Sequence, residues 1–171
     1  MQYAACLPAL MPIKYDGKVL KMDYRIVLIN GYDETRLLAK SLIHKGYKVT
    51  AINECPQNCQ KLSTIKGLQV FCGDGSKPFV LEDASVYGAD LAIAMSPYDD
   101  ANLVICQLCK KKYNVKKTVA IITDPSNKKL FKDLGVDSVV CAVSIISGII
   151  QESVALNKDI NEITEGLGLD G

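Results

Sequence analysis

The sequence has no tryptophan and only one histidine, His44. A multi-histidine metal site or a serine–histidine–aspartate triad could therefore form only around that residue. An excess of charge of either sign is also missing, because Lys and Arg total 20 against 19 for Asp and Glu, a net charge of +1. Such a chain has no overall field that attracts nucleic acid or an anionic membrane. We therefore expect no nucleic-acid partner and no metal.

Long hydrophobic runs are absent from the first residues. Segment 1–23 is interrupted by two prolines and a glycine, and no basic residues precede its apolar part. It therefore lacks the pattern of a signal peptide or a membrane span. We predict a cytoplasmic protein in which 1–23 is an N-terminal extension. This extension could be an extra hairpin, an arm that contacts a partner or a partly disordered segment, and Met22 could be an alternative start.

The cysteines lack the pattern of a disulfide framework or a zinc site. They number seven, they are scattered, and several fall inside apolar runs such as "LQVFCGD" and "SVVCAV". Cys55 and Cys59 form "CPQNC", and Cys106 and Cys109 form "CQLC", but neither pair belongs to a repeated C-x2-C knuckle. The sequence therefore predicts reduced, mostly buried or incidental thiols.

Apolar runs alternate with amphipathic stretches from Tyr24 onward. The runs predict strands at 25–30, 48–53, 68–72, 89–95, 117–123 and 137–142. Helices are expected between them at about 34–45, 56–65, 77–85, 99–114 and 126–134, with a last one near 144–157. Near-continuous apolar strands indicate a parallel sheet that is buried on both faces. With right-handed crossovers, this predicts a Rossmann-like, doubly wound α/β fold of about six strands in the order 3-2-1-4-5-6.

Short motifs mark the loops and helix ends of this pattern. They occur in the order Gly73-Asp74-Gly75, Gly88-Ala89-Asp90, "DDANL" at 99–103, Asp124-Pro125 and "LFKDLGVDSVV". In this order and spacing, the sequence from about Tyr24 to Leu156 resembles the TrkA N-terminal domain family, also called RCK N-terminal or KTN. Its members are cytosolic regulators of potassium channels and of Trk/Ktr potassium uptake systems.

The resemblance implies a domain organisation and a set of partners. It implies a Rossmann-like domain over 24–142, a crossover helix over 143–157 and a tail over 158–171. Family members bind NAD(H), ATP or ADP and form dimers and rings beneath a membrane pore. The expected function is therefore that of a cytosolic, nucleotide-responsive regulatory subunit of a potassium uptake system or channel. The implied partners are a second copy or a higher ring, an adenine nucleotide, and a pore subunit that holds the protein at the inner face of the membrane.

The glycine-rich phosphate loop is degenerate. The fingerprint G-x-G-x-x-G supplies a tight turn, a close approach to pyrophosphate and close packing of the helix on the strand. Aligned with the family's first strand, those places hold Asn30, Tyr32 and Thr35. Gly31 lies one position away and could serve the turn, and Asn30 tolerates a left-handed backbone. Tyr32 would intrude where a phosphate needs room.

The charge beside this loop opposes an anion. Asp33 and Glu34 begin the helix. There their negative charges interact favourably with the helix dipole but would repel pyrophosphate. The loop is therefore either a well-capped helix end in a site that has lost its ligand or an unusual phosphate cradle.

Residues that would hold the adenosine half are better preserved. Asn53 and Glu54 end the second strand, where dinucleotide folds bind a ribose. Glu54 would point to the opposite face unless the strand ends there. The resemblance places Gly73-Asp74-Gly75 near an adenine and Ser96 at the switch point. These residues could hold AMP, adenosine or an adenine nucleotide, or they could be only a turn and a strand end.

Two other functions stay open. An NAD(P)-dependent oxidoreductase needs a substrate domain and a positioned acid or base, and the chain offers no evident candidate for either. We therefore expect no enzyme. The other alternative is a stand-alone adenine-nucleotide sensor unconnected with potassium.

Overall fold

The computed structural model describes residues 14–15, 18–19 and 23–156. The predicted tail, 158–171, and most of the predicted extension, 1–23, lie outside these described residues. Within the extension, β1 (Lys14–Tyr15) pairs with β2 (Lys18–Val19) as a separate antiparallel sheet. Of the alternatives for the extension, the hairpin is therefore the one present at these residues.

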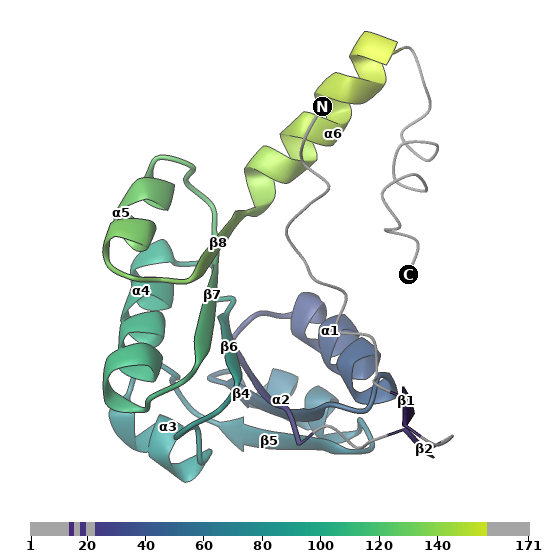
Figure 1. Ribbon diagram of the computed structural model, residues 1–171, viewed down its shortest axis with the longest axis vertical. Coiled ribbons are helices and arrows are strands. Elements are labelled where there is room, and N and C mark those ends of the chain that lie inside the picture. Colours follow the sequence, from purple (N-terminus) through teal and green to yellow (C-terminus); the bar gives the residue numbers. More distant parts are fainter. Residues whose placement is uncertain (1–13, 16–17, 20–22, 157–171) are drawn as a thin grey trace.

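The main sheet has six parallel strands (Figure 1). They are β3 (Arg25–Ile29), β4 (Lys48–Asn53), β5 (Leu68–Cys72), β6 (Leu91–Ala94), β7 (Lys117–Ile122) and β8 (Ser138–Cys141). Their spatial order is β5-β4-β3-β6-β7-β8. Counted along the chain within this sheet, the order is 3-2-1-4-5-6, which confirms the predicted doubly wound Rossmann-like fold.

Helices connect the strands, as the apolar pattern predicts. They are α1 (Asp33–His44), α2 (Pro56–Ser63), α3 (Pro78–Asp83), α4 (Asp99–Gln107), α5 (Asn127–Asp133) and α6 (Ala142–Leu156). The helix predicted over 99–114 continues from α4 into a π-helical segment, η1 (Leu108–Lys112), and ends there. The predicted element types are confirmed, with ends displaced by a few residues.

Burial on both faces explains the apolar strands. Ile26 and Leu28 of β3 lie in a cluster against which residues of α1 pack. The alternate residues Val27 and Ile29 share a second cluster with α3, α4 and α5. Because successive strand residues point to opposite faces, a strand covered on both sides must be apolar at every position.

The centre of the sheet creates the switch point. β3 pairs with β4 on one side and with β6 on the other, so the chain winds outward in both directions from this pair. Loops 30–32, 54–55 and 95–98 follow the carboxyl ends of β3, β4 and β6. In doubly wound sheets, ligands bind in the crevice outside these strand ends.

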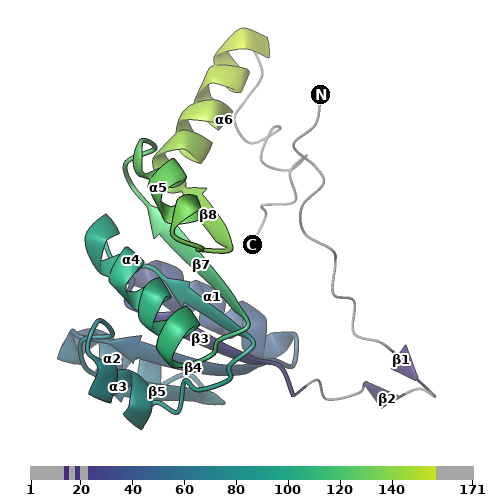
Figure 2. The same ribbon diagram turned by 60° about the vertical axis from the view of Figure 1, so that its left-hand side comes forward.

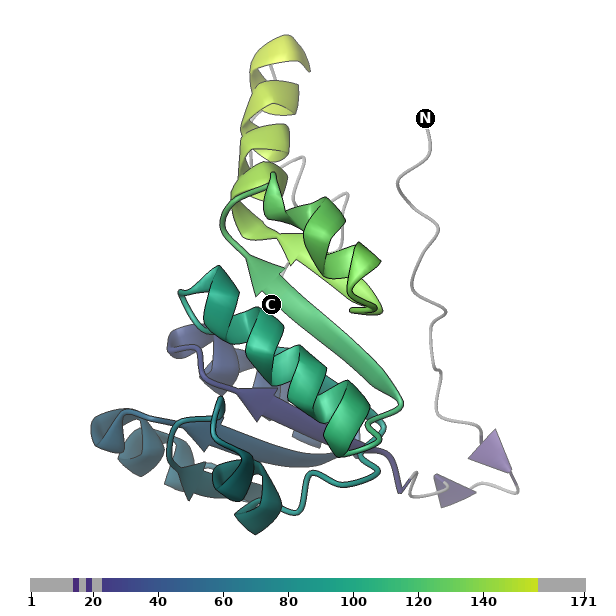
Figure 3. The same ribbon diagram turned by 90° about the vertical axis from the view of Figure 1, so that its left-hand side faces the viewer.

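The last helix extends away from the sheet. α6 follows β8 directly and projects from the domain (Figures 1, 2 and 3). It carries exposed aliphatic side chains, Val143, Ile145, Ile146, Ile150 and Val154. Among residues 14–15, 18–19 and 23–156, no helix has the length and apolar character needed to cross a membrane.

Candidate functional site

A left-handed turn follows β3. Asn30 and Gly31 have φ angles of 62° and 76°. A Cβ atom on Gly31 would lie 2.5 Å from Thr35 Oγ1 and 3.1 Å from Met95 Cβ. Only glycine meets both constraints at this position. Gly31, one position away from the fingerprint, therefore supplies the tight turn.

Thr35 occupies the place of the third fingerprint glycine. Its side chain is fully buried, and its hydroxyl donates to the carbonyl oxygen of Asn30 at 2.5 Å. The threonine thus ties the first turn of α1 to the end of β3. This bond holds the helix at the turn and satisfies a buried hydroxyl.

Asn53 fastens the turn to the neighbouring loop. Its Nδ2 donates to the carbonyl oxygen of Gly31 at 2.7 Å, and its Oδ1 accepts the Cys55 backbone N–H at 3.0 Å. The residue is 3% exposed. The amide predicted to meet a ribose is thus engaged within the protein. β4 ends at Asn53, so Glu54 lies beyond the strand, and its side chain is exposed. The alternation of strand faces therefore does not force Glu54 to the opposite face of the sheet.

Carboxylates occupy the start of α1, as predicted. The backbone N–H of Tyr32 donates to Oε2 of Glu34 at 3.2 Å, and Oδ1 of Asp33 accepts from Nε of Arg36 at 3.4 Å. Tyr32 is 60% exposed. An N–H group that could bind phosphate at this helix end is therefore capped by a carboxylate of the same turn.

A buried asparagine holds the loop after β6. The carboxamide oxygen of Asn102 accepts the Ser96 N–H at 2.8 Å, and its Nδ2 donates to the carbonyl oxygens of Ser96 and Ile121 at 2.8 and 2.7 Å. Asn102 is fully buried. Sequence reasoning assigned it no role, although the "DDANL" motif contains it. Ser96 is therefore fixed by protein contacts at the switch point.

Asp99 closes the next loop. It accepts hydrogen bonds from the N–H groups of Thr123 at 2.8 Å and Asp124 at 3.2 Å, and from Nδ2 of Asn127 at 2.9 Å. Burial alone would raise the pKa of this carboxyl group, but the hydrogen bonds from Asn127 and the backbone outweigh burial and lower it. Asp99 is thus an ionised anchor that joins α4 to the loop after β7.

The loop of Gly73, Asp74 and Gly75 is close-packed. A Cβ on Gly73 would lie 2.9 Å from Cγ2 of Val80, and one on Gly75 would lie 2.2 Å from Cγ2 of Ile29. Oδ1 of Asp74 accepts the N–H of Ser76 at 2.8 Å. Burial favours a raised pKa for Asp74, but the bonds from Ser76 and the nearby Lys77 produce a lowered one. The glycines allow the loop to lie directly against β3 and α3.

The crevice at the switch point is nearly filled. Its cavity has a volume of about 20 Å³, little more than one water requires. The lining residues are Asn30, Gly31, Tyr32, Asn53, Glu54, Cys55 and Pro97, which we call the switch-point crevice. The predicted residues Asp33, Glu34, Gly73, Asp74, Gly75 and Ser96 do not line it. Among the described atoms, the buried Oδ1 of Asn30 has no hydrogen-bond partner.

The prediction of reduced thiols throughout was wrong for one pair. Cys59 of α2 forms a disulfide with Cys72 of β5, with Cα atoms 5.9 Å apart. The cause is strand register: Asn53 of β4 pairs with Cys72, so the helix that follows β4 begins beside the end of β5. This bond joins α2 to the edge of the sheet. Sequence spacing alone did not show that proximity.

The other cysteine pair agrees with the prediction. Cys106 and Cys109 are free and almost fully buried. Burial raises the pKa of both thiols to about 12, so they stay protonated and unreactive. Within the described part of the chain, no group of three or more metal-ligating side chains converges.

Comparison with known proteins identifies the family. Residues 27–142 match the TrkA-N domain. A Trk system potassium uptake protein TrkA homolog of Methanothermobacter thermautotrophicus is 29% identical over 143 residues, which are 84% of this chain and 66% of that protein. The chain thus spans about two thirds of the length of this curated relative.

Solved structures have the same fold. The Kef CTD of Shewanella denitrificans in AMP-bound form superposes with a TM-score of 0.66 at 23% identity, covering 84% of this chain and 88% of that one. The GsuK channel bound to NAD superposes with a TM-score of 0.60 at 21% identity, covering 68% of this chain and 21% of that one. Because the family match covers most of the chain, this protein belongs to the TrkA-N domain family.

Proposed function

We propose that this chain is a cytoplasmic, nucleotide-responsive regulatory domain of a potassium uptake system or channel. The observation that carries the proposal is the similarity to a TrkA homolog of a Trk potassium uptake system across 84% of the chain. Ligand occupancy would shift the population of two conformers, and a membrane pore subunit would respond to that shift. In this role the domain performs no chemical step, and we propose that it is not an enzyme.

The turn after β3 supports a ligand site at the switch point. Gly31 keeps a left-handed conformation, and Asn53 and Thr35 hold the loop by hydrogen bonds. The unpartnered Oδ1 of Asn30 is a hydrogen-bond acceptor. Its complement is a donor, such as a ribose hydroxyl or an adenine amino group. These features favour the nucleoside part of an adenine nucleotide in the crevice.

Tyr32 controls the room for that ligand. It lines the switch-point crevice, whose volume of about 20 Å³ is far smaller than the 300–1,000 Å³ or so of ordinary ligand pockets. Its side chain is 60% exposed, so rotation outward into solvent is sterically simple. We propose that nucleotide entry displaces Tyr32. Binding would then move the start of α1, which is one route from ligand to conformational change.

α6 supplies a surface for a second copy. Its exposed aliphatic side chains, Val143, Ile145, Ile146, Ile150 and Val154, would be shielded from water in a dimer. In a two-fold dimer the same face of each copy meets its counterpart, so one apolar helix suffices for both sides of the interface. We propose a homodimer, or a larger ring built from dimers, beneath the pore subunit.

Two measurements test the proposal. Purified protein, cleared of carried-over nucleotide, is titrated calorimetrically with NAD⁺, NADH, ATP, ADP and AMP. We expect saturable binding of at least one of them. Co-purification with a potassium pore subunit of the same cell should occur and should change with that nucleotide. Absence of both nucleotide binding and pore association would overturn the proposal.

A matched pair of variants tests the role of Tyr32. Tyr32→Ala removes the ring from the crevice and should raise the affinity for the bound nucleotide about tenfold, since a protein that needs no rearrangement binds without that cost. Tyr87→Ala removes another exposed tyrosine that lies outside the crevice and should leave the affinity unchanged. Equal effects of the two substitutions would contradict a gating role for Tyr32.

A further inference from the structure

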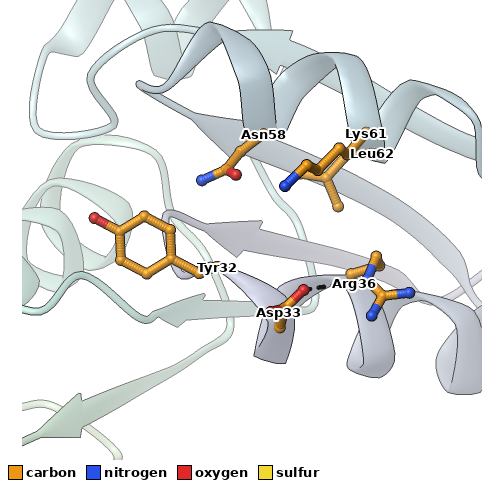
Figure 4. A pocket seen from close by; sticks show the side chains of 6 residues that line it. All are labelled: Tyr32, Asp33, Arg36, Asn58, Lys61 and Leu62. Atoms are coloured by element: carbon orange, nitrogen blue, oxygen red, sulfur yellow. Dashed lines mark hydrogen bonds and ion pairs between the residues drawn. The ribbon is translucent and has the colours of Figure 1, made fainter.

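A second cavity lies beside the crevice, between α1 and α2. It is lined by Tyr32, Asp33, Arg36, Asn58, Lys61 and Leu62, which we call the α1–α2 groove (Figure 4). Its volume is about 160 Å³, against about 20 Å³ for the switch-point crevice. In Figure 4, Asn58 and Lys61 extend from α2 toward the α1 side of the groove. Polar groups from two helices therefore face one cavity.

An unsatisfied donor lies in this groove. Nδ2 of Asn58 is buried and has no hydrogen-bond partner among the described residues. Nearly all buried N–H groups in folded proteins are paired with protein, water or ligand. Asn58 lines the groove, so an oxygen ligand that enters the cavity and reaches Nδ2 would satisfy this donor.

Two cationic groups lie beside Asn58. Within the part of the chain that the structure describes, Lys61 forms no ion pair, whereas Lys110 and Lys116 are paired with Asp137 and Asp90. Arg36 uses its Nε for Asp33 at 3.4 Å. Its two terminal nitrogens have no partner among residues 23–156, the range with described side chains. Arg36 from α1 and Lys61 and Asn58 from α2 thus line the same groove.

We propose that the α1–α2 groove binds the phosphate group of a small anion, such as a phosphomonoester. The terminal nitrogens of Arg36 fit two oxygens of a phosphate, and Lys61 supplies a charge-assisted bond to a third. Nδ2 of Asn58 completes the set. Asp33 opposes the anion, and its net effect is to hold the affinity below what the two cations alone would give.

Tyr32 joins this groove to the switch-point crevice, because its side chain lines both. The crevice offers an unpartnered acceptor, Asn30 Oδ1, while the groove offers an unpartnered donor, Asn58 Nδ2. A nucleoside monophosphate has donors on its sugar and base and acceptors on its phosphate, so it complements both. The choice of a nucleotide as the ligand rests on the proposed nucleotide-responsive function. The choice of an anion rests on the groove alone.

Calorimetric titration of the full chain with inorganic phosphate, AMP and adenosine tests the site. We expect phosphate and AMP to bind, and Arg36→Gln and Lys61→Gln each to weaken both about tenfold, as the loss of a charge-assisted hydrogen bond predicts. The matched controls are Lys40→Gln on α1 and Lys66→Gln after α2, two exposed lysines that do not line the groove. Both control variants should bind phosphate and AMP with the affinity of the original protein.

Two further variants give opposite signs. Asp33→Asn removes the opposing carboxylate and should strengthen phosphate binding several-fold. Asn58→Leu removes the buried donor without adding charge and should weaken phosphate binding while leaving the chain folded by circular dichroism. If Lys40→Gln and Lys66→Gln weaken phosphate binding as much as Arg36→Gln and Lys61→Gln do, phosphate responds only to the overall positive charge of the protein. That result would overturn the inference.

The titration also separates this inference from the proposed function. If AMP binds and is insensitive to Arg36→Gln and Lys61→Gln, the groove inference fails while nucleotide regulation stands. If inorganic phosphate binds in the groove and no nucleotide binds anywhere, the groove inference stands and nucleotide regulation fails. If neither phosphate nor AMP binds at concentrations up to about 10 mM, the groove inference is overturned.

Discussion

The switch-point crevice and the α1–α2 groove are neighbours that share Tyr32, but they use their polar side chains differently. In the crevice, the amide of Asn53 is fully engaged between Gly31 and Cys55. In the groove, Nδ2 of Asn58 has no partner among the described residues. The two asparagines, one at the end of β4 and one in α2, thus have opposite states: the first organises loops, and the second has a donor without a partner among the described residues.

This difference bears on how a degenerate nucleotide site is recognised. The residue types at the phosphate loop suggest that pyrophosphate binding has been lost. Tyr32 stands where the fingerprint has a glycine, and Asp33 and Glu34 add negative charge at the start of α1. The geometry nevertheless retains the left-handed turn at Gly31. One side-chain donor that is unpaired within the described part of the chain, Nδ2 of Asn58, belongs to α2 and lies outside the fingerprint. A search confined to the fingerprint would miss it.

Breaking the turn should have the largest effect on stability. Gly31→Ala combines a positive φ with a Cβ placed 2.5 Å from Thr35 Oγ1. Backbone strain of about 1–2 kcal/mol and overpacking of about 1–3 kcal/mol predict a loss near 4 kcal/mol in the free energy of unfolding. Urea denaturation measures it. Gly135→Ala is the control, because its φ is also positive but its Cβ would meet nothing within 4 Å; a loss there as large as at Gly31 would contradict the steric explanation.

Reducing the disulfide should have the next largest effect. The bond between Cys59 and Cys72 closes a loop with a sequence separation of 13, for which loop entropy predicts about 3 kcal/mol of stabilisation. Cys72→Ser should lower the free energy of unfolding by that amount and loosen the α2 side of the groove. Cys55→Ser, at a free cysteine, is the control. A Cys72→Ser protein as stable as the original under oxidising conditions would show that the bond contributes nothing.

The two asparagines should respond in opposite directions to the same substitution. Asn53→Leu leaves the Gly31 carbonyl and the Cys55 N–H without their partner and should cost about 2 kcal/mol. Asn58→Leu removes an unsatisfied donor and should be neutral or stabilising by up to about 1 kcal/mol when no anion is present. Thermal unfolding in phosphate-free buffer compares them. If both substitutions lowered the free energy of unfolding by a similar amount, the side chains of Asn53 and Asn58 would not differ in hydrogen bonding as described.

Acid should have the smallest effect, by weakening the contacts of Asp99 between α4 and the loop after β7. The folded-state pKa of Asp99 is lowered, so its contribution to stability is present above its ordinary value of 3.8 and is lost as pH falls through the lower folded value. Asp99→Asn should therefore reduce the acid dependence of unfolding below about pH 4. An unchanged pH profile in this variant would show that Asp99 is not held ionised by Asn127 and the loop after β7.

Much of the fold follows from local sequence pattern. The strand at 48–53 was predicted with its observed bounds, because a buried parallel strand must be apolar on both faces. The strand expected at 89–95 is shorter, Leu91–Ala94, because Asp90 turns toward the start of β3 and its Oδ2 accepts the N–H of Arg25. Element type was therefore readable, while ends depended on contacts between distant residues.

The groove and the disulfide were not readable in the same way. Asn58 and Lys61 lie three residues apart on one face of α2, which the sequence does show. Their proximity to Arg36 depends on how α2 packs beside α1. Likewise, Cys59 reaches Cys72 only through the register of β4 with β5. Tertiary packing, rather than spacing along the chain, created both features.

Nuclear magnetic resonance of the isotope-labelled chain during titration with inorganic phosphate tests the assignment of the groove most directly. We predict that the largest shifts occur at the side-chain NH₂ of Asn58 and the terminal guanidinium N–H groups of Arg36, and that they saturate with one phosphate bound per chain. Shifts concentrated at Gly31, Asn53 and Glu54, with Asn58 and Arg36 unmoved, would contradict this assignment and return phosphate binding to the switch-point crevice.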